Sequence, residues 1–390
     1  MHQVQINKDW LGIEQHLVAS SDGVIRFVDV IDPALWSWMC EGAHKELATL
    51  ARATGTKITD HPPTTHVSAW DQLGVSPRWA QALPTHVFKK WLKEFISNLL
   101  FIVNKWDDSY YGKEFQIQQR LLQKLRQPFV DDVMIKEIAD DRVDQFLSRG
   151  DGLAPKSTYD NTTSVTGRMS IVRGPNILTL DRQYRKIFKS RHRDGKIIQV
   201  DFTSLEPCVC LAVQGKKFEG DAYHWAQKSL KSDVARDVIK VATMSALYGM
   251  TPSRFAKKFA EVPDAADLLF RVRDSFGVDS LERRLKETHS NTGNIKNYFG
   301  RVITVDKTSP YVAYYVQSTA VDVVCQGFMS LIEQIETREI DAVPLYLIHD
   351  ALMIDASQLA EKQLNDICKN GIYIPTLDCT FPVKIKTIDS

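Results

Sequence analysis

The sequence lacks the features that mark several large classes of protein. None of its apolar runs is long enough to cross a membrane, and its first residues do not have the layout of a signal peptide. Its six cysteines are scattered, and the only close pair, Cys208 and Cys210, has no second pair at zinc-finger spacing. It also contains no internal repeat and no low-complexity tract. We therefore expect a cytoplasmic protein without membrane contact, whose cysteines are reduced core residues.

An excess of charge of one sign is absent as well. The 49 lysines and arginines nearly balance the 48 aspartates and glutamates, so any surface for nucleic acid must be a local patch. One segment does concentrate cations, with only Asp181 and Asp194 against them: Arg182, Arg185, Lys186, Lys189, Arg191, Arg193 and Lys196. We predict that this segment contacts phosphates, and the alternative is a solvated basic loop.

Apolar spacing predicts strands that are separated by long helical segments. Apolar residues three and four apart predict helices within 85–150, 205–214, 222–290 and 310–337, and a further helix at 33–53. Short apolar runs predict strands at 24–30, 197–200, 345–348, 351–354 and 381–388, and a hairpin at 298–305. Strands split by helical insertions indicate an α+β fold.

The most informative pattern is a ladder of side chains four residues apart, which Gly249 follows. On an α-helix such residues share one face, so two cations, a methionine and a tyrosine form one stripe: Arg236, Lys240, Met244 and Tyr248. The cations lie toward the helix N-terminus, where the helix dipole disfavours positive charge unless an anion is present. A helix start that carries Arg and Lys is a good site for a phosphate chain.

Two aspartates follow apolar strands, one before the ladder in the sequence and one after it. Asp201 comes directly after 197–200, and Asp350 lies at the turn between 345–348 and 351–354. Two such carboxylates brought together would bind a divalent cation, and oxygen ligands select Mg²⁺ or Mn²⁺. Taken singly, each has an ordinary explanation as a turn residue or a helix cap. With the ladder between them, a two-metal phosphoryl-transfer site is the better explanation.

Three segments resemble, in order and spacing, the polymerase portion of the family A DNA polymerases, the DNA polymerase I family. Asp-Phe-Thr-Ser-Leu-Glu at 201–206 resembles motif A, residues 236–249 resemble motif B, and His-Asp at 349–350 resembles motif C. Thr-Gly-Arg-Met-Ser at 166–170 and Gln-Ser-Thr-Ala-Val-Asp at 317–322 resemble the elements that flank these motifs. The match covers about residues 155–390.

The resemblance implies a right-hand polymerase of the α+β class, with an antiparallel palm sheet and helical fingers and thumb. It places the thumb at 81–154, the palm at 155–214 and 301–390, and the fingers at 215–300. Residues 1–80 form an N-terminal region of unknown role and are candidates for docking replisome partners. They are also too few for the 3′–5′ exonuclease domain of this family, so no proofreading activity is expected.

The resemblance also implies roles for single residues. Asp201, Asp350 and the backbone carbonyl of Phe202 would hold two Mg²⁺ ions, with Mn²⁺ as a substitute, and Lys240 would neutralise or protonate the leaving group. The dNTP would contact residues on and near the ladder: Arg236, Lys240, Met244, Tyr248, Glu206, and either His224 or Tyr223. Glu206 would exclude the ribose 2′-hydroxyl. Primer–template DNA would contact six further residues: Arg168, Gln317, His349, Arg182, Arg185 and Lys186.

The chain departs from the family pattern at several positions. Met244 stands where the family has an aromatic residue, and Ala351 stands where motif C ends in Glu. Pro207 and Cys208 replace the arginine that closes motif A. These departures predict a divergent enzyme of a phage or mobile element, acting in a bacterial or phage-infected cell, with lower fidelity and altered sugar selectivity.

The expected function is therefore a template-directed DNA polymerase that extends a primer 3′ end. One alternative is a single-subunit, phage-type RNA polymerase or primase, because those enzymes also have Met at the position of Met244. Glu206 argues against this alternative, since those enzymes have a small residue there. The other alternative is a non-catalytic DNA-binding relative, which the retention of Asp201, Lys240 and Asp350 together argues against.

Overall fold

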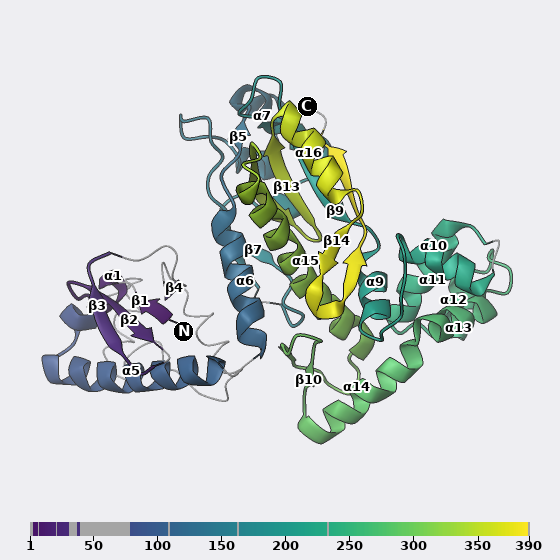
Figure 1. Cartoon of the computed structure of the whole chain (residues 1–390), viewed down its shortest axis with the longest axis horizontal. Coiled ribbons are helices and arrows are strands. Elements are labelled where there is room, and N and C mark those ends of the chain that lie inside the picture. Colours follow the sequence, from purple (N-terminus) through teal and green to yellow (C-terminus); the bar gives the residue numbers. More distant parts are fainter. Residues whose placement is uncertain are drawn as a thin grey trace. The chain divides into compact units, whose positions relative to one another are not determined.

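The computed structural model describes residues 3–6, 8–20, 22–30, 37–39, 79–107, 110–161, 164–231 and 234–388. The chain divides into two compact units, residues 1–119 and 120–390, each of which is described by itself (Figure 1). Within the helix expected at 33–53, only 37–39 are described, and they form a strand. Pairing of this segment with a neighbouring strand overrides its helical pattern.

The first unit contains a four-stranded sheet in the order β3-β2-β1-β4. The strands are β1 (Gln3–Ile6), β2 (His16–Ser20), β3 (Ile25–Val28) and β4 (Ser37–Met39). Strand β4 runs parallel to β1, and the other pairs are antiparallel. Among the described residues of this unit, three helices accompany the sheet: α1 (Lys8–Leu11), α4 (Trp79–Ala82) and α5 (Thr85–Asp107). The apolar stripe of α5 buries Trp91, Phe95 and Leu99 against Leu17, which confirms the helix predicted from its spacing. Helix α6 (Tyr110–Lys124) contains the boundary between the units.

The second unit is organised around an antiparallel sheet in the order β12-β13-β9-β16. Its strands are β9 (Lys196–Phe202), β12 (Ala342–Ile348), β13 (Ala351–Ala356) and β16 (Val383–Thr387). The predicted strands at 197–200, 345–348, 351–354 and 381–388 are thereby confirmed, although β16 begins only after a short preceding strand, β15 (Cys379–Phe381), which pairs with β14 (Ile372–Ile374).

One face of this sheet forms the core. Phe202 packs against Phe328 of helix α15 (Tyr311–Thr337), with ring centroids 5.1 Å apart. A Cβ at Gly327 would lie only 2.8 Å from the Phe202 ring, so the absence of a side chain there lets the helix approach the sheet. Because side chains alternate along a strand, Asp201 points to the opposite face from Phe202. Helix α16 (Gln358–Cys368), which the sequence did not predict, contacts β9, β13 and β16.

The helical stretch predicted at 222–290 consists of separate helices beside α9 (Leu205–Ala212), as Figure 1 shows. They are α10 (Ala222–Leu230), α11 (Arg236–Leu247), α12 (Pro252–Lys258), α13 (Ala265–Phe276) and α14 (Val278–Thr292). Residues with positive φ end or separate them, namely Lys231, Gly249, Asp264 and Gly277. These breaks allow α11 to pack against both α10 and α13.

The predicted hairpin at 298–305 is wrong in its bounds. Strands β10 (Ile295–Lys296) and β11 (Val302–Ile303) are shorter and begin three residues earlier. The intervening turn is built by Asn297, whose Oδ1 accepts from the backbone N–H groups of Phe299 and Arg301 at 3.0 and 2.9 Å. Its Nδ2 donates to Asp322 of α15 at 2.6 Å, which ties the turn to that helix.

Shorter elements complete the second unit. They are β5 (Phe129–Val130), α7 (Asp132–Ile138), α8 (Asp141–Asp144), β6 (Thr158–Asp160), β7 (Ser170–Arg173), β8 (Phe188–Lys189) and the 3₁₀ helices η1 (Ile177–Thr179), η2 (Arg182–Ile187) and η3 (Pro375–Leu377). The Tyr159 hydroxyl of β6 donates to the carbonyl of Leu347 at 2.9 Å and accepts from its N–H at 3.1 Å. It thus satisfies backbone groups at the edge of β12.

Five cysteines within the described ranges are free thiols, of which Cys379 alone is only half-buried, and Cys40 lies outside those ranges. Among the helices that the structure describes, none combines the length and the apolar character needed to cross a membrane.

Candidate active site

The two candidate metal-binding aspartates lie at one end of the central sheet, Asp201 on β9 and Asp350 in the turn between β12 and β13. Asp201 on β9 is paired directly with Ala351, the first residue of β13, so Asp350 is one position further along. The N–H of Phe202 donates to the carbonyl of Asp350 at 3.1 Å, which fixes this register. His349 takes a left-handed conformation with φ 56°, and this conformation closes the tight turn that presents Asp350.

Proximity and partial burial make these carboxylates candidates for binding a cation. Burial raises the pKa of Asp350, and the negative charge of Asp201 raises it further. The described part of the chain contains no group of three or more His, Cys, Asp or Glu residues that could hold a metal, and Ala351 is buried where the resemblance expects a third carboxylate. Two carboxylates still fit Mg²⁺, which usually takes one or two from the protein and completes its shell with water and substrate phosphates.

Lys386, which the sequence did not single out, is part of this site. Its Nζ lies 3.1 Å from Oδ2 of Asp201, and the lysine side chain is 47% exposed. The sequence alone could not place Lys386 beside Asp201, because the two residues are 185 positions apart and meet only through the pairing of β16 with β9.

The cations of the basic segment at 182–196 differ in burial and in their partners. Arg185 is 8% exposed, and its Nη1 donates to Oε1 of Gln199 at 3.1 Å, while its Nε has no hydrogen-bond partner within the described residues. Burial lowers the pKa of the Arg185 guanidinium, as does the charge of Arg182, while Asp201 raises it. Arg182 and Lys186 are exposed on the same 3₁₀ helix, η2.

Three other cations of that segment are neutralised by acidic residues. Lys189 pairs with Asp131 at 2.8 Å, Arg191 with Asp341 at 2.6 Å, and Lys196 with Glu361 at 3.1 Å. The basic patch is therefore smaller than the sequence suggests, and phosphate contact by Arg182, Arg185 and Lys186 stays a prediction.

The ladder forms one helix, α11, that begins at Arg236 and has Tyr248 as its C-cap. Arg236 does not lie free at the helix start. Its Nε donates to Oδ2 of Asp221 at 2.7 Å, its Nη2 contacts the same oxygen, and its guanidinium lies 5.0 Å from the ring centre of Tyr223. Lys240 is exposed and forms no ion pair with any residue in the described ranges, whereas Met244 is half-buried. Lys240 is thus the ladder's available cation.

Asp221 organises the start of α10 beside the ladder. Its side chain caps α10 by accepting from the N–H of Tyr223 at 3.1 Å. Burial raises its pKa, but hydrogen bonds from Ser204, Tyr223 and Arg236 outweigh burial and hold the pKa below the ordinary value. His224 is exposed 3.4 Å from the same carboxylate, whereas Tyr223 is buried. Of the two candidates for phosphate contact, only His224 is accessible.

A hydrogen-bond chain joins the end of the ladder to two other elements. The Tyr248 hydroxyl donates to Oε2 of Glu206 on α9 at 3.1 Å and accepts from Nε2 of Gln317 on α15 at 3.3 Å. Thr166 donates to Oε1 of Gln317 at 2.7 Å. Burial, and then the charge of Glu206, raise the pKa of Tyr248, which keeps its hydroxyl protonated as a donor. We refer to Thr166, Gln317, Tyr248 and Glu206 as the Tyr248 chain.

Arg168 and His349 complete the surroundings of Asp350. Arg168 approaches Oε1 of Glu206 at 3.8 Å. Partial burial lowers the pKa of His349, as do the charges of Arg168 and Arg185, so the imidazole is neutral near pH 7. A pocket is lined by residues of four predicted motifs and by three residues outside them, Val324, Cys325 and Leu347. The motif residues are Arg168, Met169, Leu205, Glu206, Gln317, Ala320, Val321, His349 and Asp350. The fold therefore brings Arg168, Glu206, Gln317 and His349 together with Asp350 around this pocket, and their roles stay predictions.

Gly167 gives the Arg168 loop its shape. It has a φ of 74°, and the Arg301 guanidinium packs where a Cβ would project. Any side chain at this position would meet both backbone strain and a buried arginine.

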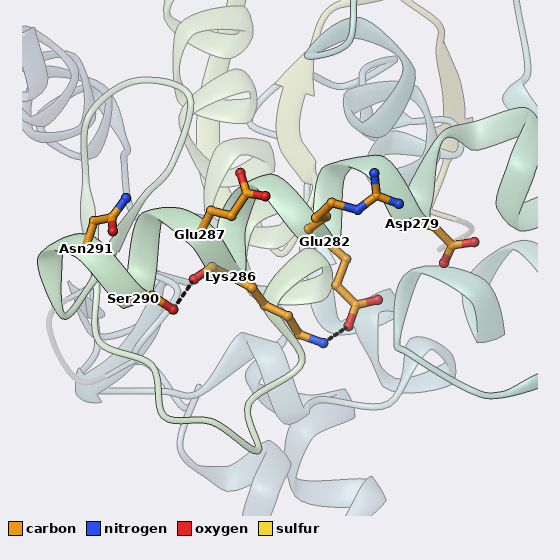
Figure 2. A pocket seen from close by; sticks show the side chains of 7 residues that line it. Asp279, Glu282, Lys286, Glu287, Ser290 and Asn291 are labelled. Carbon is orange, nitrogen blue, oxygen red and sulfur yellow. Dashed lines mark hydrogen bonds and ion pairs between the residues drawn. The ribbon is translucent and has the colours of Figure 1, made fainter.

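A larger surface hollow, of about 520 Å³, lies along α14. Figure 2 shows the side chains that line it, which come from α14, and Lys286 pairs with Glu282 at 2.6 Å. Arg273 pairs with Asp279 and Glu282. Acidic and basic groups neutralise one another there, and neither Asp201 nor Asp350 lines this hollow. We therefore do not assign the active site to it.

Comparison with known proteins identifies the fold. No family model matches the sequence, and no curated protein matches it. Among solved structures, the chain is similar to the polymerase domain of Pol1 from M. smegmatis, determined in complex with DNA primer-template and dNTP. The TM-score is 0.59 at 13% sequence identity, and the match covers 99% of this chain and 94% of that one. The chain therefore has the α+β fold of a DNA polymerase domain, as predicted, and its central sheet corresponds to the palm.

Proposed function

We propose that this protein is a template-directed DNA polymerase that adds deoxynucleotides to a primer 3′ end. The observation that carries the proposal is that β9 and the turn before β13 bring Asp201 and Asp350 together at one end of the sheet. Helix α11, whose cation Lys240 forms no ion pair with any described residue, is joined through Tyr248 to Glu206, five residues after Asp201. The chain is proposed to be a divergent, phage or mobile-element type of the family A enzymes, with residues 1–80 open to replisome partners and without proofreading activity.

The metal would be held by Asp201 and Asp350, with the Phe202 carbonyl as a further candidate ligand. When bound, two Mg²⁺ ions would supply activation of the primer hydroxyl and neutralisation of the triphosphate and the leaving pyrophosphate. The half-buried position of Asp350 strengthens its interaction with a cation, because nearby water screens it less.

The nucleotide would be bound by the ladder. Lys240 carries the contact with the triphosphate, because Arg236 is engaged by Asp221 and reaches a phosphate only when that pairing is shared or released. Tyr248 would contact the nascent base pair, and Glu206, held by the Tyr248 hydroxyl, would meet the 2′ position of the sugar. These assignments favour dNTPs over rNTPs.

The primer terminus would lie near Asp350. Arg168 and Gln317 line the pocket beside it and carry donors suited to the acceptors that every correct base pair presents in the minor groove. His349 and Arg185 would approach backbone phosphates. The buried Nε of Arg185 has no hydrogen-bond partner among the described residues, which is consistent with an anionic ligand.

A primer-extension assay with dNTPs and rNTPs tests the proposal. We expect dNTP-dependent extension in Mg²⁺ or Mn²⁺ and much slower extension with rNTPs. Equal extension with both would favour a phage-type RNA polymerase or primase, and no extension with either would favour a non-catalytic DNA-binding protein.

A substitution in the metal site should separate catalysis from binding. Asp350→Ala should abolish extension while primer–template affinity survives, measured by fluorescence anisotropy. Asp366→Ala, an exposed aspartate of α16, is the matched control and should leave extension unchanged. Retained turnover in Asp350→Ala would refute the metal assignment.

A further inference from the structure

Lys386 reaches the candidate metal site from the edge of the palm sheet. It lies on β16 directly opposite Gln199, and its side chain extends along the sheet to Asp201, two residues further along β9. Its Nζ is 3.1 Å from Oδ2 of an aspartate that is only 16% exposed. A second lysine on the same strand, Lys384, is paired directly with Asp201 in register, yet it forms no ion pair with any described residue.

This lysine offsets a repulsion that the fold creates. The register places Asp201 directly opposite the buried Ala351, the first residue of β13, and Asp350 is the turn residue just before Ala351. Without a cation, two carboxylates so placed repel each other. Among the described residues, Lys386 supplies the ammonium that contacts Asp201, and no arginine or lysine forms an ion pair with Asp350.

We propose that Lys386 is the resident counter-ion of Asp201. The lysine ammonium competes with the divalent cation for the Asp201 carboxylate and thereby sets the affinity of the site for metal. The inference rests on the proposed function, because that function assigns Asp201 to the metal. Lys386 is a positioning residue that acts through Asp201. In the metal-free protein it stabilises the paired aspartates, and when a divalent ion binds, its positive charge weakens binding.

The sign of the effect is what distinguishes this role from simple support. If Lys386 only held Asp201 in place, removing its charge would weaken metal binding. If it competes, removing its charge tightens binding. The expected change is roughly three- to tenfold, the size produced by deleting one unit charge beside a divalent-ion site in a largely aqueous environment.

The test is direct Mn²⁺ binding to the full chain, followed by electron paramagnetic resonance of the free ion, without DNA or nucleotide. We expect Lys386→Gln to bind Mn²⁺ roughly three- to tenfold more tightly than wild type, Lys386→Arg to match wild type, and Asp201→Asn to lose the site. Lys384→Gln is the matched control, and it should change affinity less than about twofold because Lys384 makes no ion pair with Asp201. Weaker binding in Lys386→Gln, or an equal effect in Lys384→Gln, would overturn the proposal.

Two further measurements keep the result unambiguous. In EDTA, Lys386→Gln should unfold at a lower temperature than wild type, and saturating Mn²⁺ should remove the difference. An equal melting temperature in EDTA would argue against the counter-ion role. If wild type binds Mn²⁺ at this site but extends no primer, the polymerase function fails while the role of Lys386 stands. If Asp201→Asn binds Mn²⁺ as wild type does, the role of Lys386 fails whether or not primers are extended.

Discussion

The Tyr248 hydroxyl offers the sharpest test of how the proposed site selects its sugar. Tyr248→Phe keeps the ring and removes only the group that donates to Glu206 and accepts from Gln317. A hydrogen bond to a carboxylate contributes about 1.5–3 kcal/mol when shielded from water. Because Tyr248 is 46% exposed, we discount this to about 1 kcal/mol, or roughly fivefold in a rate ratio.

The expected result is a lower preference for dNTPs over rNTPs, with polymerase activity retained. Single-turnover kcat/KM values for a dNTP and the matching rNTP should give a dNTP preference about fivefold lower in Tyr248→Phe than in wild type. Glu206→Ala should lower the preference further, because it removes the side chain that the hydroxyl holds. In the double variant the Tyr248 substitution should have no added effect, since the hydroxyl acts through Glu206.

Tyr373→Phe provides a matched control. It deletes another tyrosine hydroxyl that donates to a carboxylate, Asp378, at 2.7 Å, in the β14–β15 hairpin. It should leave the dNTP preference unchanged. A preference in Tyr248→Phe within twofold of wild type, or effects that add in the double variant, would refute the reasoning.

Three further predictions address stability and DNA binding. Tyr159→Phe leaves the Leu347 backbone groups without their partner and should lower the free energy of unfolding by about 1–3 kcal/mol in urea titrations. Asp221 has a lowered pKa, so the stability it contributes is present above its ordinary pKa of 3.8 and is lost as the pH falls below it. Asp221→Asn should therefore lower stability at pH 7 by about 1 kcal/mol, through its bond with Arg236, and show a smaller further loss between pH 5 and 3 than wild type does. Arg185→Gln should weaken primer–template binding. The slope of log K against log salt concentration should become shallower by about the amount of one phosphate contact. An unchanged slope would assign Arg185 a purely structural role.

Local pattern predicted the elements whose environment is uniform along their length. Helix α5 has its stripe of Trp91, Phe95 and Leu99 because one whole face is buried. Strand β13 could be predicted because it is buried along its whole length, and β9 because Ile198, Val200 and Phe202 on one face are buried in the core. The breaks between α10 and α14 were missed because they depend on single residues with positive φ, such as Lys231 and Asp264. Neither residue type predicts that conformation from the sequence.

The site was predictable to the extent that its residues lie in motifs with fixed local spacing. Asp201, Asp350 and Tyr248 could be placed because each follows or ends an element visible in the sequence. Arg236 was assigned to phosphate, but its partner Asp221 lies on another helix, and only the packing of α10 against α11 brings the two together. Lys386 could not be placed because its position depends on strand register, which is set by tertiary pairing.

The same register explains why this palm carries two carboxylates and a lysine together. At the end of β9, Asp201 has Ala351 as its neighbour on one side and Lys384 on the other, with Lys386 reaching it from two residues along β16. The position where the resemblance expects a third carboxylate is taken by Ala351, which is 1% exposed and supplies no ligand. A site with fewer negative charges and an adjacent ammonium must bind divalent ions more weakly than one with three carboxylates. Nucleotide phosphates would then have to supply more of the ligands, so metal and dNTP should bind with strong mutual dependence.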